Sequence, residues 1–283
     1  MGTFGTVTSP RADASTLTGV SETALLTLLV RATEARRADG IIDDPVAVGL
    51  VDSIDFDFGK FGFANRQDMA LRALAFDRET GAYLRDHPEA TVVALAEGLQ
   101  TSFYRLEASG ISDTFRWHTV DLPPIVTLRD KLLPPSARVS SSAQSALDYS
   151  WMDDIDDSRG VFITAEGLLM YLQPTEALAL ITECAKRFPG GQMMFDLPPY
   201  WFAWWARQGL LRPSLRYRVP PMPFSLSVSQ AADLVNTIPG VRAVHDVELP
   251  TGRGTVLNAL IWASYRLPVI DQLRGVTTRL EFG

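Results

Sequence analysis

Acidic side chains and glycines stand directly after short apolar runs in the middle of the sequence. The residues at these positions are Glu97-Gly98, Asp121 and Glu166-Gly167. A carboxylate that ends an apolar strand is hard to explain as packing, and glycine lets the backbone pass close to a ligand. In an open α/β sheet, ligands bind beyond the carboxyl ends of the strands. The pattern therefore predicts a ligand site at one edge of a sheet.

Each of these strand ends also has a purely structural interpretation. Gly98 is the lone glycine of its loop and could simply make the turn from strand to helix. Asp121 could accept hydrogen bonds from the two hydroxyls of a ribose, or it could cap the helix that follows Pro123. Beyond a third strand, Ser145-Ala146 could border an adenine ring or form an ordinary turn. Among these positions, the functional interpretation is favoured most at Glu166.

A segment rich in tryptophan, arginine and proline runs from 198 to 223 and is too long for an ordinary connection. It predicts a lid over a second ligand, because aromatic rings stack on flat molecules and arginines bind acidic groups. The side chains that we expect to contact this ligand are Tyr200, Trp204, Arg207 and Arg216. The alternative is a lid that packs its rings on the body of the protein and leaves its arginines in water.

Histidines at 87, 118 and 245 are the candidates for a general base at neutral pH. His87 precedes the expected sheet and His245 lies within a late strand, so both are expected to be structural. His118 lies in the middle of a strand and is a candidate base. No histidine stands at a strand end, which favours a carboxylate acceptor that is already ionised, or a phenol ionised by arginines. No Cys/His cluster has the spacing of zinc ligands, so no metal is expected.

Short apolar runs that alternate with helix-length segments must position these residues. The expected strands are 91–96, 115–120, 137–141, 161–165, 192–196, 241–248 and 255–264. Strands spaced by helices predict an α/β fold with a mostly parallel, Rossmann-like sheet of seven strands. The last two runs are separated only by 250–254, so we expect them to pair as an antiparallel hairpin.

The first third of the chain is helical in pattern. The segment 21–37 has amphipathic spacing with Ser21 as a candidate N-cap. Asp44-Pro45 opens a second helix, and a third extends from about 67 to 85. We expect residues 1–20 to form a flexible arm. Residues 21–283 are expected to form one domain, with a helical N-terminal part over 21–88 and the lid insertion over 198–223.

Composition limits the classes of function. The 283 residues carry a formal net charge of -7 with a pI near 5.0, which argues against a nucleic-acid-binding surface. Cys184 is the single cysteine and is expected to be inert core. No run approaches the ~20 apolar residues that cross a bilayer, and the N-terminus lacks the layout of a signal peptide. We expect a cytoplasmic protein with a small-molecule partner and no nucleic-acid or membrane partner.

Several motifs together indicate a family. They are Glu166-Gly167-Leu168-Leu169-Met170-Tyr171-Leu172, Val120-Asp121-Leu122-Pro123, Leu147-Asp148 leading to Trp151, Leu71-Arg72-Ala73, and Gly98-Leu99-Gln100-Thr101. In this order and spacing the chain resembles the leucine carboxyl methyltransferase-like family, in its bacterial branch of polyketide O-methyltransferases. The resemblance implies a class I methyltransferase fold and S-adenosyl-L-methionine as cofactor. It also implies methyl transfer to a carboxyl or phenolic hydroxyl of a small, aromatic or polyketide-like acceptor.

The resemblance implies roles for individual residues. Arg72 would pair with the cofactor's carboxylate, Glu166 would lie near its amino group, and Asp121 would bind the ribose. The full set that we expect to bind the cofactor is Arg72, Glu97, Gly98, Asp121, Leu122, Ser145, Ala146, Glu166 and Gly167. The chain departs from the family at three positions, since Ala96 stands where glycine is usual and Gln100 and Ser145 stand where aspartate is usual.

Two rival functions follow from the same fold. A non-catalytic protein could use it to hold adenosylmethionine or a metabolite, because fold alone does not assign function. A nicotinamide-dependent oxidoreductase is disfavoured, because the pyrophosphate fingerprint needs several glycines and this loop has Gly98 alone.

Overall fold

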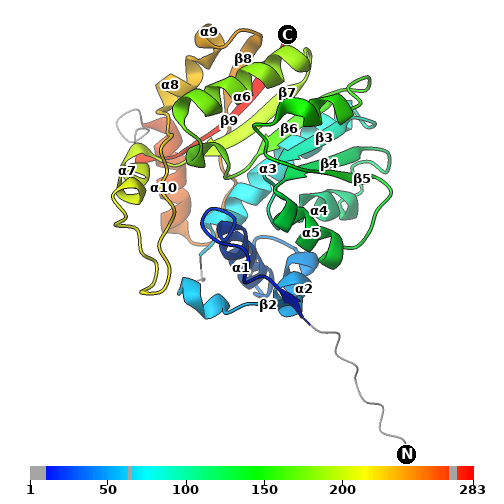
Figure 1. Cartoon of the computed structure of the whole chain (residues 1–283). Helices are drawn as coiled ribbons and strands as arrows, with labels where there is room; N and C mark the ends of the chain where they lie inside the picture. The colour runs from blue at the N-terminus through cyan, green and yellow to red at the C-terminus, as the bar shows by residue number, and fades with distance from the viewer. Residues whose placement is uncertain (1–10, 63–65, 268–272) are drawn as a thin grey trace, which may run out of the picture.

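A computed structural model describes residues 11–62, 66–267 and 273–283 of the chain. Within them, a seven-stranded sheet has helices packed against both faces (Figure 1). Its strands are β3 (Thr91–Leu95), β4 (Arg116–Asp121), β5 (Val139–Ala143), β6 (Val161–Ala165), β7 (Gln192–Leu197), β8 (Val241–Asp246) and β9 (Val276–Phe282). The order is β5-β4-β3-β6-β7-β9-β8, and only β9 runs antiparallel to its neighbours. The predicted α/β, mostly parallel sheet is confirmed.

Helices precede the first strand of this sheet and connect the later strands. They are α1 (Thr23–Ala35), α2 (Pro45–Ser53), α3 (Asp68–Asp86), α4 (Ser102–Ala108), α5 (Pro123–Leu132), α6 (Pro174–Arg187), α7 (Tyr200–Arg207), α8 (Val228–Ala232), α9 (Leu234–Thr237) and α10 (Thr255–Arg266). Short 3-10 turns cover Phe58–Phe61, Tyr149–Asp154 and Leu169–Tyr171.

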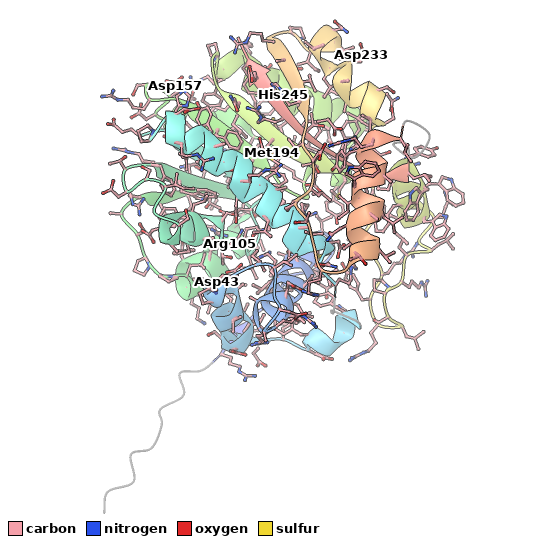
Figure 2. The ribbon with its side chains drawn as sticks, turned by 180° about the vertical axis from the view of Figure 1, so that it is seen from behind. Asp43, Arg105, Asp157, Met194, Asp233 and His245 are labelled. Atoms are coloured by element: carbon pink, nitrogen blue, oxygen red, sulfur yellow. The ribbon has the colours of Figure 1, made fainter. Side chains whose placement is uncertain are left out.

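The central strands are buried on both faces, as their apolar runs require. In β3, Val93 packs in the cluster that includes α6, while Val92 and Ala94 pack with residues of α3. Figure 2, drawn from behind, shows α3 crossing the sheet near Met194 of β7. The next residue, Phe195, belongs to the cluster on the opposite face. This alternation holds the strand ends in register at one edge of the sheet.

The N-terminal helices begin largely where the sequence predicts. Asp44 caps α2, because its side chain accepts a hydrogen bond from the Ala47 amide at 3.0 Å. The prediction for α1 was wrong by two residues: the helix begins at Thr23, and Ser21 is not its cap. The Thr23 hydroxyl instead donates to the Val20 carbonyl at 2.6 Å, so the turn before the helix is closed from within the helix.

The predicted arm over 1–20 needs correction in its second half. Residues Ala12–Asp13 form strand β1, which pairs in parallel with β2 (Ile54–Asp55). Ala14 and Leu17 are buried in the cluster formed by α1 and α2. Residues 1–10 of the predicted arm lie outside the described residues. Two backbone pairings and buried side chains therefore hold residues 12–17 against the body.

The predicted hairpin of 241–248 with 255–264 was wrong. The second run is the helix α10, and the antiparallel strand is β9 at the end of the chain. Among the partly buried residues of α10, Leu257, Ile261 and Tyr265 recur at a spacing of four, which is a helical period. The β-branched and aromatic content of the run suggested a strand, but its length of 12 residues is typical of a helix.

Candidate active site

A cavity of about 1170 Å³ opens at the carboxyl edge of the sheet. All nine residues predicted to bind the cofactor line it: Arg72, Glu97, Gly98, Asp121, Leu122, Ser145, Ala146, Glu166 and Gly167. They come from α3 and from segments that follow β3, β4, β5 and β6, so the fold brings distant parts of the chain into one site. The cavity exceeds the ~300–1,000 Å³ of a usual small-ligand pocket. It therefore has room for two ligands side by side.

The loop after β3 has the backbone of a close-approach turn. Gly98 has a φ of +59°, and Ala96 has a φ of +48°. Ala96 is the one non-glycine residue with positive φ among the described residues. This left-handed conformation favours glycine because a Cβ crowds the following carbonyl. The left-handed turn thus explains why glycine is usual at this position in the family. In this chain Ala96 adopts the same turn.

A buried ion pair beneath this loop fixes its position. Arg129 donates to the carbonyls of Gly98 and Gln100, each at 2.9 Å, and pairs with Glu97 at 2.8 Å. The Glu97 carboxylate also accepts from Thr119 Oγ1 at 2.5 Å. The contacts of the Glu97 carboxylate all go to its Oε2, whereas its Oε1 is buried and has no hydrogen-bond partner among the described residues. Glu97 therefore shapes the loop through one oxygen, and its role in binding the cofactor stays a prediction.

Asp121 lies at the end of β4 and joins this strand to the loop. Its two carboxylate oxygens accept hydrogen bonds from the amides of Gly98 and Leu122, each at 2.7 Å. Burial raises the pKa of Asp121, while these two amides act to lower it. The alternative that Asp121 caps α5 was wrong, because the N-cap position is Leu122 and no side chain caps that helix.

A cluster of charged groups lies at the ends of β6 and β7. Arg72 donates through Nε to Glu166 at 2.9 Å and through Nη1 to Asp196 at 3.2 Å. Asp196 also accepts from the Gly167 amide at 2.7 Å. Gln100 donates to the same Glu166 oxygen at 2.7 Å. Two carboxylates thus face one guanidinium, which leaves an excess of negative charge that suits a cationic ligand.

Asp196 is a site residue that the sequence analysis missed. It lines the cavity and is almost fully buried, and burial raises its pKa whereas Arg72 acts to lower it. The same signal that singled out Glu166 was present here, because an apolar run ends on a carboxylate at Asp196. The signal was overlooked because no glycine follows it.

A second network of buried charges lies behind the cluster and ties it to the N-terminal helices. Arg105 of α4, labelled in Figure 2, pairs with Asp77 at 2.6 Å and with Asp44 at 2.7 Å. Arg31 of α1 is fully buried, pairs with Asp44 at 3.4 Å and donates to the Leu99 carbonyl at 2.7 Å. The N-terminal helices therefore support the cavity floor, because their charges hold the segment after Gly98 from below.

The four lid residues predicted to contact an acceptor do not line the cavity. Tyr200 and Trp204 are 64% and 41% exposed. Arg207 stacks over the ring of Tyr200, and Arg216 pairs with Asp57 at 2.5 Å. Tyr200, Trp204 and Arg207 lie on α7 outside the cavity lining, and Arg216 on the returning arm of the lid is held by Asp57. The structure therefore does not bring these four residues to the cavity.

The cavity face of the lid is also aromatic. The lid residues that line the cavity are Pro198, Pro199, Trp201, Phe202, Trp205, Leu210, Leu211, Arg212, Pro213, Tyr217, Val219 and Met222. Opposite them, α10 contributes Leu260, Ile261 and Tyr265. Of the lid arginines, Arg212 reaches this lining, and within the described ranges its guanidinium has no ion pair. Arg66 and Arg274 also line the cavity, but they are paired with Asp68 and Asp246. The outer part of the cavity is therefore mostly apolar, and Arg212 is its unpaired cation among the described residues.

The histidines lie away from the cavity, so His118 was wrong as a candidate base. Its ring is held between the hydroxyls of Ser140 at 2.8 Å and Ser142 at 2.9 Å, and burial lowers its pKa. His87 stacks on Tyr83, in agreement with a structural role. Cys184 is fully buried, as predicted.

The described part of the chain has neither a cluster of metal ligands nor a membrane-spanning helix. No group of three or more His, Cys, Asp or Glu side chains there is placed to hold a metal ion. No helix there is both long enough and apolar enough to span a bilayer.

Comparisons with known proteins agree with this architecture. The sequence profile of the leucine carboxyl methyltransferase family matches residues 24–185. The tetracenomycin polyketide synthesis O-methyltransferase TcmP of Streptomyces glaucescens is 31% identical over 80% of this chain and 82% of its own length. An S-adenosyl-L-methionine-dependent methyltransferase, dpfgK, of Gibberella zeae is 26% identical over 65% of this chain and 67% of its own length.

Solved structures show the same fold. A DUF574 family protein from Streptomyces avermitilis has a TM-score of 0.58 at 13% identity and covers 92% of this chain and 97% of its own. A candidate methyltransferase from Thermobifida fusca has a TM-score of 0.54 at 15% identity and covers 90% of this chain and 94% of its own.

The fold, with its cavity at the strand ends, is that of a class I methyltransferase that uses S-adenosylmethionine. More specifically, the chain belongs to the leucine carboxyl methyltransferase family.

The residues present fit this cofactor. Leu122 is 45% exposed although it is large and apolar, and it lines the cavity together with Ala146. Such a surface suits the flat face of an adenine ring. At the other end, Glu166 and Asp196 outnumber Arg72, which suits a ligand that carries both an ammonium and a sulfonium.

Proposed function

We propose that this protein transfers a methyl group from S-adenosylmethionine to an oxygen of a small aromatic or polyketide-like acceptor, and that the reacting group is a carboxylate. The observation that carries the proposal is the division of one continuous cavity into two ends. We name them the donor end (Arg72, Asp121, Leu122, Ala146, Glu166, Asp196) and the acceptor end (Trp201, Phe202, Trp205, Arg212, Leu260, Ile261, Tyr265).

At the donor end, the chain would hold the cofactor through groups that the fold already orients. Asp121 keeps lone pairs free beyond the Gly98 and Leu122 amides, and these would accept from ribose hydroxyls. Arg72 keeps Nη2 donors free for a carboxylate, and Glu166 would accept from an ammonium. The bound cofactor supplies a methyl group on a cationic sulfur, which is reactive toward an oxygen anion.

At the acceptor end, the chain would supply positioning and the exclusion of water. A flat acceptor would stack on Trp201 and Trp205. Arg212 would meet an anionic group of the acceptor, since a guanidinium binds carboxylates with two donors. Holding the two reactants in line is the main source of rate in such a displacement. A lid over 198–223 would keep the reacting oxygen anion from being solvated.

A carboxylate fits better than a phenol for a chemical reason. It is ionised at neutral pH and loses no proton when it is methylated, so it needs no base. Among the described residues, no histidine lines the cavity, and the carboxylates of Glu166 and Asp196 are paired with Arg72. The name of the relative TcmP, an O-methyltransferase of polyketide synthesis, supports oxygen as the acceptor atom and a polyketide-like molecule as the acceptor.

The test is a turnover assay with matched acids and phenols. The enzyme is incubated with trideuteromethyl-labelled S-adenosylmethionine and benzoic, 2-naphthoic or 2-anthracenecarboxylic acid, or with phenol, 2-naphthol or 2-anthrol. We expect labelled methyl esters, with turnover that rises with ring number, and little ether. If ethers form and esters do not, the reacting group of the acceptor is a phenol and not a carboxylate. Tight cofactor binding with no product from either series would favour the non-catalytic binding protein.

A further inference from the structure

Tyr217 is a buried tyrosine at the wall of the cavity. It belongs to the returning arm of the lid, is 4% exposed and lines the cavity. Its ring packs on the ring of Phe61 in an edge-to-face contact, with the two ring centroids 4.8 Å apart. Its hydroxyl oxygen is buried and has no hydrogen-bond partner within the described residues. The ring is thus held by packing while its polar atom is left unused.

An unpaired buried hydroxyl destabilises a fold, because it has lost its hydrogen bonds to water and gained none in return. Such groups are rare in native proteins, and each calls for a physical reason. A phenylalanine at 217 would keep the contact with Phe61 without this cost. Packing therefore does not explain the hydroxyl. Tyr83 also has a buried hydroxyl without a partner among the described residues, but Tyr83 does not line the cavity, so of the two tyrosines Tyr217 is the one placed to meet a ligand there.

The surroundings of Tyr217 define what this ligand must offer. Burial raises the pKa of Tyr217 well above its usual value, and nearby Tyr171 and Glu22 act in the same direction. The hydroxyl therefore keeps its proton at neutral pH and can donate it in a hydrogen bond. Glu22, the acidic neighbour, is already paired with Lys60. The missing partner is an acceptor atom that enters with the ligand.

We propose that the Tyr217 hydroxyl donates a hydrogen bond to a carboxylate oxygen of the methyl acceptor, the oxygen that does not receive the methyl group. The assignment rests on the proposed function and adds to it one contact that selects the acceptor class. Tyr217 joins the cavity wall from the returning arm of the lid, and its ring packs in the cluster formed with the N-terminal helices, whereas the donor end is built from α3 and the strand ends. A hydrogen bond to a charged oxygen is stronger than one to a neutral oxygen, so an acid is preferred over its ester.

The test compares Tyr217→Phe with Tyr83→Phe. Tyr83 is a matched control, because it is a buried tyrosine of α3 that does not line the cavity. Calorimetric titration of 2-naphthoate into the full-length protein saturated with S-adenosylhomocysteine gives the acceptor affinity. Titration of S-adenosylhomocysteine alone gives the cofactor affinity, and a thermal melt gives the stability.

We expect Tyr217→Phe to weaken 2-naphthoate binding by about tenfold. Cofactor affinity should stay within about twofold and the melting temperature should not fall, because no protein hydrogen bond is lost. Tyr83→Phe should leave both affinities unchanged. Unchanged 2-naphthoate binding in Tyr217→Phe would overturn this assignment alone. If Tyr217→Phe weakens the binding of S-adenosylhomocysteine and of 2-naphthoate equally, the hydroxyl acts at the donor end, and the assignment to the acceptor is also overturned. If benzoate, 2-naphthoate and 2-anthracenecarboxylate all fail to bind the wild-type protein, the proposed acceptor class fails and this assignment with it.

Discussion

The donor end and the acceptor end of the cavity differ in how their side chains are held. At the donor end, Arg72 and Asp121 each make two hydrogen bonds to other parts of the chain. At the acceptor end, Trp205 is 46% exposed, the helix α10 has no fully buried residue, and Arg212 has no ion pair within the described residues. One end is fixed before a ligand arrives, and the other keeps apolar surface and charge available.

This difference matches the demands on the two ends. A fixed polar site binds one cofactor without further ordering of side chains, which preserves affinity. An aromatic surface with a single unpaired cation fixes the orientation of a ligand less strictly, so it accommodates flat acceptors of different outline. The largest effects of mutation on binding and stability are therefore expected at the donor end, and selective effects on the acceptor are expected under the lid.

The largest expected effect follows from Arg72→Ala. It leaves Glu166 and Asp196 buried without their cation, a change that costs about 3–5 kcal/mol of unfolding free energy. We expect affinity for S-adenosylhomocysteine to fall by at least ~100-fold, measured by calorimetry beside urea unfolding. Arg72→Lys is the control: it keeps a positive charge and should restore most of the stability and only part of the affinity.

The pH dependence of that variant sharpens the explanation. Burial raises the pKa of Asp196, and Arg72 acts to lower it, so removal of Arg72 raises this pKa further. The folded state then takes up a proton at a higher pH than the unfolded state, and protonation relieves the penalty. The stability deficit of Arg72→Ala should shrink as the pH falls from 7 toward 5. A deficit that is constant over this range would contradict the charge-pair explanation.

Asp121→Ala should give the next largest effect. It removes the partner of the Gly98 and Leu122 amides and the proposed ribose contact, so we expect cofactor affinity to fall by about 10- to 100-fold. Asp121→Asn keeps one accepting oxygen and should lose less. Normal affinity together with a large loss of thermal stability would make Asp121 a structural residue only.

The two faces of α7 offer a matched pair of tryptophans. Trp205 lines the cavity and Trp204 does not, although both are about equally exposed. Trp205→Ala should raise the KM for 2-naphthoic acid by about tenfold through lost stacking and burial. Trp204→Ala should leave it within about twofold. Equal effects would mean that α7 supports the fold as a whole and does not contact the acceptor.

The smallest predicted effect concerns the lid arginines. Arg212→Ala should raise the KM for aromatic acids by about threefold, because Arg212 is an exposed residue and an ion pair made by an exposed side chain contributes little. Arg207→Ala and Arg216→Ala are the controls, since neither residue lines the cavity. Cofactor affinity should not change in any of the three. If Arg216→Ala raises this KM more than Arg212→Ala does, Arg216 faces the acceptor and the assigned orientation of the lid is wrong.

Sequence predicted the donor end far better than the acceptor end, for a geometric reason. The register of a parallel sheet fixes where the residue after each strand must lie, so Asp121 and Glu166 could be placed at one edge from the pattern alone. Asp196 followed the same rule and was overlooked. In the helix α7 large aromatic residues occupy the cavity face and the exposed face, while the small residues Ala203 and Ala206 are buried, so the aromatic residue type alone does not indicate which rings meet the cavity.

The misassigned strand at α10 has a related cause. Its partly buried residues recur with a helical period, but its exposed residues Val256, Leu260 and Trp262 are also apolar. Apolar residues on every side erase the contrast by which helix and strand are told apart. Tertiary position at the mouth of the cavity, rather than local pattern, explains why such residues are tolerated on the surface.

A crystal structure of the complex with S-adenosylhomocysteine would show which end of the cavity holds the cofactor. We expect the ribose hydroxyls on Asp121, the adenine beside Leu122 and Ala146, and the amino-acid group at Arg72 and Glu166. The space between α7 and α10 should hold no part of the cofactor. An adenosyl group bound between those two helices, with the strand ends uncontacted, would contradict the assignment of donor and acceptor ends.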